Sequence, residues 1–135
     1  MRMGKTMKKI LIVDDEESIL ATLSRALKRN GVEIITATRI EEAEYAINNT
    51  LFDLLIADIR LTGVLGREGL ELLQYVKDKS PETKVIIMTG YGSDEVEKEA
   101  YEKGAYFYFD KPLDLRILRE KVSHLGLYEE EEAKS

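Results

Sequence analysis

The chain has 135 residues, of which 44% are hydrophobic and 34% are charged, and its formal net charge is −6. This composition is typical of a single globular domain with a substantial core, and it excludes an intrinsically disordered chain. Because the sequence contains no cysteine, disulfides and thiolate metal sites are excluded, and we expect a cytoplasmic protein. No apolar run approaches the ~20 residues of a membrane span, so no membrane association is expected.

Half of the net charge, −3 of −6, comes from the end of the sequence, where four successive glutamates at 129–132 are followed by one lysine. Such a run is typical of a solvated segment. We therefore predict a leader over residues 1–7, one domain over 8–127 and an acidic tail over 128–135. The mildly acidic body has no basic patch, which argues against direct binding of nucleic acid.

Short apolar runs alternate along the chain with segments in which apolar residues recur at helical spacing. Runs without polar alternation, such as residues 54–57, are typical of strands buried on both faces of a parallel sheet, whereas 32–37 alternates more and is expected nearer an edge. In chain order we predict strand 10–13, helix 19–27 ending at Asn30-Gly31, strand 32–37, helix 40–47, strand 54–58, helix 70–76 stopping near Ser80-Pro81, strand 85–88, helix 94–103, strand 106–109 and helix 115–125.

Five strands that alternate with five helices predict an α/β fold, because parallel strands need crossover connections and these are nearly always right-handed. The expected architecture is a three-layer, doubly wound (βα)5 sandwich around a parallel five-stranded sheet. A short sheet of this kind favours the flavodoxin-like strand order 2-1-3-4-5. The predicted helix 94–103 is highly charged and has few apolar residues, so we expect it to be loosely held.

Polar residues follow the predicted strands where each one ends. Asp14 and Asp15 follow the first strand, Asp58 ends the third, Thr89 follows the fourth, and Lys111 comes after the fifth. In the predicted strand order these ends face one pocket, the usual ligand site of such sheets. Three crowded carboxylates repel one another unless a cation lies among them, and oxygen ligands with room for water suit Mg²⁺.

Acids, a cation, a lysine and a hydroxyl together favour phosphoryl transfer, with Asp58 as the nucleophile that forms an aspartyl phosphate. Each residue also has a structural interpretation. Asp14 and Asp15 can cap the first helix, Thr89 can open a turn, and Lys111-Pro112 can be a simple strand exit. We favour one site over coincidences at four strand ends.

At this level of detail the sequence resembles the response-regulator receiver domains of two-component signalling, over about residues 8–125. The motifs that carry the resemblance are Ile-Val-Asp-Asp-Glu at 12–16, Asp58 after an apolar strand, Met88-Thr89-Gly90, Gly104-Ala105 and Lys111-Pro112. The resemblance implies that Asp58 is the phosphoacceptor, that Asp15 binds Mg²⁺ directly and that Asp14 acts mainly through water. It also implies that the main-chain carbonyl of Arg60 completes the metal site.

The resemblance further implies that Thr89 and Lys111 contact the phosphoryl group and that the bond before Pro112 is cis. Tyr108 corresponds to the family's switch aromatic, which moves into space that Thr89 vacates. The expected function is therefore a switch operated by phosphorylation rather than a turnover enzyme, although its phosphoryl transfer and autodephosphorylation are self-catalysed. The implied partners are a sensor histidine kinase or phosphotransfer protein and a downstream output protein or a missing effector domain, with a possible homodimer through residues 94–125.

Two departures from the family pattern concern the loop after Asp58. Thr62 stands where most receivers have proline, and three extra residues lie within 63–69, whose glycines we interpret as loop flexibility. Arg60 and Tyr91 are expected to line the approach of water to the phosphoryl group and to lengthen its lifetime. Residues 89–93 resemble the nitrogen-regulation branch, whose members carry an ATPase and a DNA-binding domain.

Three other functions were weighed. A dehalogenase-type phosphatase needs a second acid two residues after its nucleophile, where this chain has Arg60. A flavin carrier must hold a phosphate dianion, which the acids at 14–17 would repel. A degenerate receiver would lack phosphorylation residues that are present here.

His124, at a helix end, is interpreted as a favourable helix-dipole charge rather than a phosphohistidine.

Overall fold

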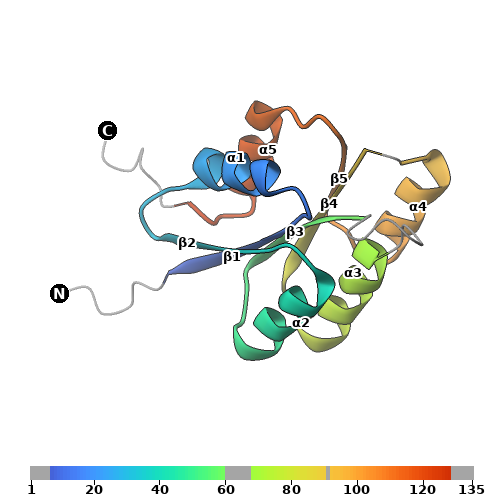
Figure 1. Cartoon of the computed structure of the whole chain (residues 1–135), viewed down its shortest axis with the longest axis horizontal. Coiled ribbons are helices and arrows are strands. Elements are labelled where there is room, and N and C mark those ends of the chain that lie inside the picture. Colours follow the sequence, from blue (N-terminus) through green and yellow to red (C-terminus); the bar gives the residue numbers. More distant parts are fainter. Residues whose placement is uncertain (1–6, 60–67, 91, 129–135) are drawn as a thin grey trace.

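The computed structural model describes residues 7–59, 68–90 and 92–128, and it contains one five-stranded parallel sheet with the strand order β2-β1-β3-β4-β5 (Figure 1). The predicted fold class and strand order are confirmed. The elements are β1 Lys8–Val13, α1 Glu17–Leu27, β2 Val32–Ala37, α2 Ile40–Asn49, β3 Leu54–Asp58, α3 Glu68–Lys79, β4 Lys84–Thr89, α4 Asp94–Glu102, β5 Phe107–Asp110 and α5 Leu115–His124.

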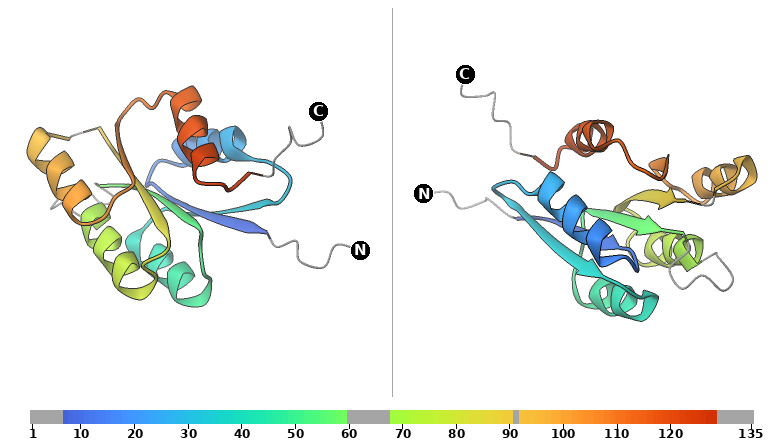
Figure 2. Two further views of the ribbon diagram at one scale, coloured as in Figure 1. Left: turned by 180° about the vertical axis from the view of Figure 1, so that it is seen from behind. Right: turned by 45° about the horizontal axis from the view of Figure 1, so that its top comes forward.

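The sheet lies between two helical layers, with α1 and α5 on one face and α2, α3 and α4 on the other (Figure 2). All five residues of β3 are buried, and they alternate between the two layers. Leu54 and Ile56 pack with α1 and α5, whereas Leu55 and Ala57 pack toward α2–α4. Burying a side chain of this size contributes about 1.5–3 kcal/mol, so an unbroken apolar run fits only the centre of a sheet covered on both faces.

The β2 edge of the sheet is less buried than its centre. The edge strand β2 has four residues that are not fully buried between buried Val32 and Ala37, as its alternating sequence predicted. The first helix ends before its predicted stop signal at Asn30-Gly31, because α1 ends at Leu27 and Lys28 is already extended. The prediction that Asn30-Gly31 ends this helix is therefore wrong, and these residues form the turn into β2 instead.

The pairing of the strands brings the predicted site residues to one edge of the sheet. Val13 pairs with Ala57, Asp58 pairs with Met88, and Thr89 pairs with Asp110. The residue after Val13 and the residue after Asp110 must therefore meet beside Asp58. This register, more than any local loop conformation, assembles the site.

Helix α4 contributes few apolar side chains to the core. Ala100 is its one buried residue. On the outer side of β5, the Tyr108 backbone N–H donates a hydrogen bond of 3.1 Å to the Tyr101 hydroxyl. Within the described ranges, no helix is both long and apolar enough to cross a membrane.

Candidate functional site

The three predicted acids lie together at the carboxyl edge of the sheet. Asp14, Asp15 and Asp58 each offer a carboxylate oxygen, and these oxygens lie within 4.8 Å of one another. Asp14 and Asp58 are buried, at 0% and 5% exposed, whereas Asp15 is open to solvent. Because all the donors are carboxylate oxygens and one side is open to water, the cluster suits a hard divalent cation.

Lys111 neutralises the buried part of this cluster. Its Nζ donates a hydrogen bond of 2.8 Å to Asp14 Oδ2 and one of 3.1 Å to Asp58 Oδ2. Its backbone N–H donates to the Thr89 carbonyl at 2.8 Å, which fixes the lysine at the end of β4. Burial lowers the pKa of Lys111, but its hydrogen bond to Asp14 and the charge of Asp58 outweigh burial, so the pKa lies above its usual value and the lysine stays protonated.

The open side of the cluster carries uncompensated negative charge. Although Asp15 is largely exposed, partial desolvation of its carboxylate raises its pKa, the charges of Asp14 and Glu16 raise it further, and Lys111 lowers it by less. A cation beside Asp15 would remove this repulsion. The charge balance therefore points to the open side of the cluster as the place for a metal ion.

Asp14 also performs the structural role that the sequence left open. Its Oδ1 accepts the Glu16 backbone N–H at 2.8 Å, just before the first turn of α1. Glu16, the N-cap residue, makes no capping hydrogen bond with its own side chain. The two interpretations are compatible, because one oxygen of Asp14 orients the helix start and the other contacts Lys111.

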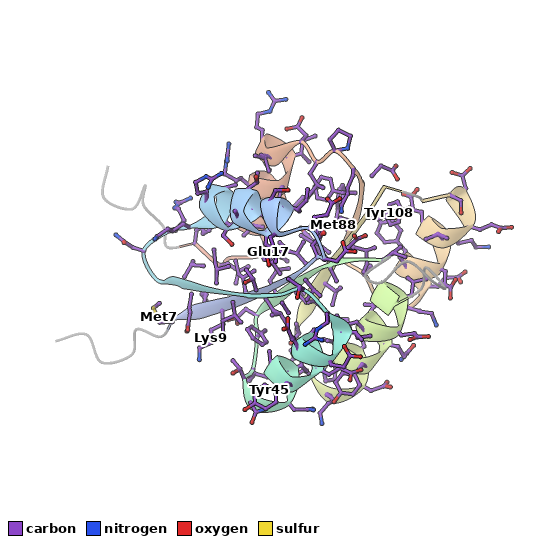
Figure 3. All side chains as sticks on the ribbon, in the orientation of Figure 1. Met7, Lys9, Glu17, Tyr45, Met88 and Tyr108 are labelled. Carbon is purple, nitrogen blue, oxygen red and sulfur yellow. The ribbon has the colours of Figure 1, made fainter. Side chains whose placement is uncertain are left out.

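Tyr108 lies on the α4 side of the sheet (Figure 3). Side chains alternate along β4, so Thr89 is on the same side as Ile87, which packs in that layer. Thr89 is 1% exposed and Tyr108 is 6% exposed. The buried Tyr108 hydroxyl has no hydrogen-bond partner among the described residues. Burial, followed by the charges of Asp110 and Glu97, raises the pKa of Tyr108 to about 12.

The peptide bond between Lys111 and Pro112 is cis, as the resemblance implied. Arg60, Tyr91 and the loop 62–67 lie outside the described residues. The predicted roles of the Arg60 carbonyl in metal binding, and of Arg60 and Tyr91 in phosphate access, therefore stay predictions.

Two glycines at the site were not recognised from the sequence. Gly69 lies in the first turn of α3 and donates its N–H to the Ile59 carbonyl at 2.8 Å. A Cβ there would overlap the Asp58 carbonyl oxygen and lie 2.5 Å from Ile59 Cα. The interpretation of Gly69 as loop flexibility is therefore wrong, because Gly69 allows α3 to approach the phosphoacceptor strand. A Cβ at Gly92 would likewise overlap the Tyr108 hydroxyl.

An apolar groove of about 450 Å³ adjoins the site on the α1 side of the sheet. It lies between the first turns of α1 and the segment that follows β5. Its lining residues are Glu16, Ser18, Ile19, Thr22, Leu23, Lys111, Pro112, Leu113 and Leu115. Lys111 thus contributes both to the acid cluster and to the wall of this groove.

A doubly wound sheet with acids, a lysine and a hydroxyl at its carboxyl edge defines a phosphoryl-transfer signalling domain. The family model for the response regulator receiver domain matches residues 10–123. The chain therefore belongs to the response regulator receiver domains, the phosphoacceptor components of two-component systems.

Individual relatives agree with this assignment. The response regulator protein PilR of Pseudomonas aeruginosa is 37% identical over 116 residues, which cover 86% of this chain and 25% of PilR. The beryllofluoride-activated NtrC4 receiver domain dimer is 34% identical with a TM-score of 0.79, covering 88% of this chain and 96% of that one. A CheY-like receiver domain protein from Methanospirillum hungatei is 36% identical with a TM-score of 0.82, covering 90% and 95%. The chain spans about a quarter of the length of PilR.

Proposed function

We propose that Asp58 accepts a phosphoryl group from a phosphohistidine on a sensor kinase or phosphotransfer protein. The observation that carries this proposal is the position of Lys111 Nζ between the buried carboxylates of Asp14 and Asp58. A carboxylate oxygen of Asp58 attacks phosphorus, the bond from phosphorus to the donor nitrogen breaks, and the donor imidazole leaves with that electron pair. Lys111 and the Thr89 hydroxyl then contact the phosphoryl oxygens.

We assign Mg²⁺ to the acid cluster, with Asp15 and Asp58 as ligands, Asp14 acting through water and the Arg60 carbonyl completing the set. The all-oxygen donor set and the raised pKa of Asp15 support this assignment. When bound, Mg²⁺ would offset the negative charge that the acids and the incoming phosphoryl group bring together. Lys111 provides the remaining positive charge from the protein itself.

Incubation with acetyl phosphate and Mg²⁺ is expected to add one phosphoryl group to the wild-type chain. The added mass should be lost in Asp58→Asn, which has no carboxylate nucleophile, and in the presence of EDTA. Asp15→Asn should slow labelling by at least about tenfold, because a metal-binding carboxylate is removed. Intact-protein mass spectrometry measures all four reactions, and an undiminished mass gain in Asp58→Asn would rule out this phosphoacceptor.

We further propose that phosphorylation changes partner binding through Thr89 and Tyr108. Both are buried on the α4 side. Helix α4 packs only buried Ala100 and half-buried Val96 against this core, whereas α2 adds three half-buried apolar residues to its one buried alanine, so α4 is a helix that can shift at low cost. Autodephosphorylation would reset the switch, with Arg60 and Tyr91 limiting the access of water. We infer that the output is a downstream protein or a further effector domain, and that the protein acts in the cytoplasm, which its cysteine-free sequence favours.

The apolar groove beside Lys111 is the proposed docking site of the phosphodonor protein. Its wall contains Lys111, so an apolar helix seated there would bring its phosphohistidine next to Asp58. Ile19→Glu is expected to slow transfer from a histidine-phosphorylated kinase by about tenfold, since it places a charge in an apolar interface. Labelling by acetyl phosphate should not change, because Ile19 is outside the acid cluster.

Ala21→Glu is the matched control, as Ala21 is exposed on the same helix and does not line the groove. Transfer rates measured by phosphoprotein gel decide the question. Equal slowing by both substitutions would show that the charge of α1, and not this groove, governs the encounter.

A second copy of this chain is the proposed partner of the face formed by residues 94–125. Helix α4 carries five acids and one lysine, whereas α5 carries three basic residues and one acid. A two-fold dimer can set α4 of each protomer against α5 of the other. Sedimentation is expected to show dimers after beryllofluoride treatment. Arg119→Glu, which reverses a charge on α5, should weaken these dimers much more than the control Lys28→Glu. Unchanged dimerisation in Arg119→Glu would refute this interface.

A further inference from the structure

Gly92 lies directly over the end of the Tyr108 ring. A Cβ at residue 92 would overlap the Tyr108 hydroxyl, and it would lie 2.9 Å from Thr89 Cγ2 and 3.0 Å from Asp110 Oδ1. The backbone at Gly92 is not left-handed, so alanine could adopt its conformation without backbone strain. The buried Tyr108 hydroxyl is therefore the nearest obstacle to a side chain at residue 92, and the side chains of Thr89 and Asp110 crowd the same position.

The free energy of burying Tyr108 has opposing contributions from its ring and its hydroxyl. Burial of the aromatic ring stabilises it, but the hydroxyl is removed from water without gaining a partner among the described residues. The Ser93 backbone N–H is near the hydroxyl but makes no hydrogen bond with it. The nearby carboxylates of Asp110 and Glu97 oppose ionisation of the hydroxyl.

We propose that residue 92 is the gate of the aromatic switch: the absence of a side chain there admits Tyr108 to its buried position, and any larger residue would hold the ring outside. This inference rests on the proposed function only in taking Tyr108 as the switch residue. The gate is steric and local. Residue 92 directly precedes Ser93, whose hydroxyl accepts the Val96 N–H and caps α4. A change in the position of Tyr108 would therefore act directly on the start of that helix.

Gly92→Ala is expected to expel Tyr108 into solvent, and the ionisation of the hydroxyl reports this directly. NMR of tyrosine labelled with ¹³C at Cζ, assigned by loss of the signal in Tyr108→Phe, measures ionisation at pH 10.5. With a pKa of about 12, wild-type Tyr108 should be about 3% ionised. In Gly92→Ala an exposed Tyr108, with an ordinary pKa near 10, should be about three-quarters ionised.

Gly90→Ala is the matched control in the same segment. Within the described part of the chain, and leaving out its chain neighbours, a Cβ at Gly90 would have Lys111 Cβ and Cδ as its nearest neighbours, each at 4.0 Å, so Tyr108 should stay neutral. A folded Gly92→Ala variant whose Tyr108 also stays neutral would overturn the gate.

A double-variant cycle covers the case in which Gly92→Ala is too unstable for NMR. Urea unfolding should show that Gly92→Ala lowers the folding equilibrium constant at least tenfold more in the presence of Tyr108 than in a Tyr108→Ala background. Equal losses in both backgrounds would overturn the proposal, because the clash would not involve the Tyr108 ring.

Neither readout uses phosphorylation, so the gate and the switch can fail separately. If the gate operates and Tyr108 is the switch, Gly92→Ala should abolish the change in α4 amide exchange that beryllofluoride induces in the wild-type chain. If Tyr108 is expelled but that change persists, the gate stands, and the proposed role of Tyr108 in signalling is refuted.

Discussion

Replacing Lys111 with methionine is expected to lower the free energy of unfolding by about 3 kcal/mol at pH 7, because two buried carboxylates lose their cation. Asp14 and Asp58 are 0% and 5% exposed, and both contact Lys111 Nζ, at 2.8 Å and 3.1 Å. Addition of Mg²⁺ should recover part of the lost stability, since the metal replaces the missing positive charge.

Phosphorylation should respond differently from stability in this variant. Mg²⁺ replaces the charge of Lys111 in the resting site, but not a donor aimed at the phosphoryl oxygens. Labelling by acetyl phosphate should therefore fall by about 10²- to 10³-fold even with saturating Mg²⁺. Urea denaturation with and without Mg²⁺, together with the labelling rate, separates the two effects.

Lys98→Met is the control for loss of a lysine, because Lys98 Nζ lies 3.9 Å from Glu102 on the exposed surface of α4 and should contribute little. Lys111→Arg keeps the charge and should retain most of the stability. If Lys111→Met were as stable as the wild-type chain at pH 7 without metal, Lys111 would not be the counter-charge of the buried acids.

The sequence was sufficient for the sheet because the signal is local and repeated. An unbroken apolar run such as 54–57 has few alternatives to a central parallel strand, and the polar residue after each run marks the edge where ligands bind. Asp14, Asp58 and Lys111 could thus be placed in one site before any contact was known. What could not be predicted is that Lys111 bonds both acids, since this depends on the strand register.

Contacts between residues far apart in the chain explain the errors. Nothing local distinguishes a glycine that makes a loop flexible from one that makes room for another segment. A glycine is needed at residue 69 because the backbone of Asp58 lies against it. A glycine is needed at residue 92 because the Tyr108 hydroxyl lies against that position. The end of α1 was placed too late for a related reason: Asn30-Gly31 is a good helix terminator, but the chain leaves the helix at Lys28 to reach β2.

Replacing Gly69 with alanine has two opposite effects on stability: it raises the helix propensity of α3, and it creates a steric clash with the end of β3. The clash is expected to dominate. Alanine favours a helix over glycine by about 1 kcal/mol, so the substitution would stabilise α3 if the site were open. The Cβ would instead overlap the Asp58 carbonyl oxygen and crowd Ile59 Cα, and backbone atoms cannot swing aside as a side chain can. We expect Gly69→Ala to lower the free energy of unfolding by about 3 kcal/mol.

The same clash should reduce phosphorylation, because the obstructed backbone carries the phosphoacceptor. A displacement of about 1 Å at a reacting group can cost about 10²-fold in rate, so acetyl phosphate should label Gly69→Ala much more slowly even at temperatures where the variant is fully folded. Urea denaturation and the labelling rate test the two parts, with Gly90→Ala as the stability control because, among the described residues outside its chain neighbours, the nearest atoms to its Cβ would be those of Lys111 at 4.0 Å. A Gly69→Ala variant more stable than the wild-type chain would mean that helix propensity dominates, and that α3 does not approach Asp58 closely enough to require a glycine.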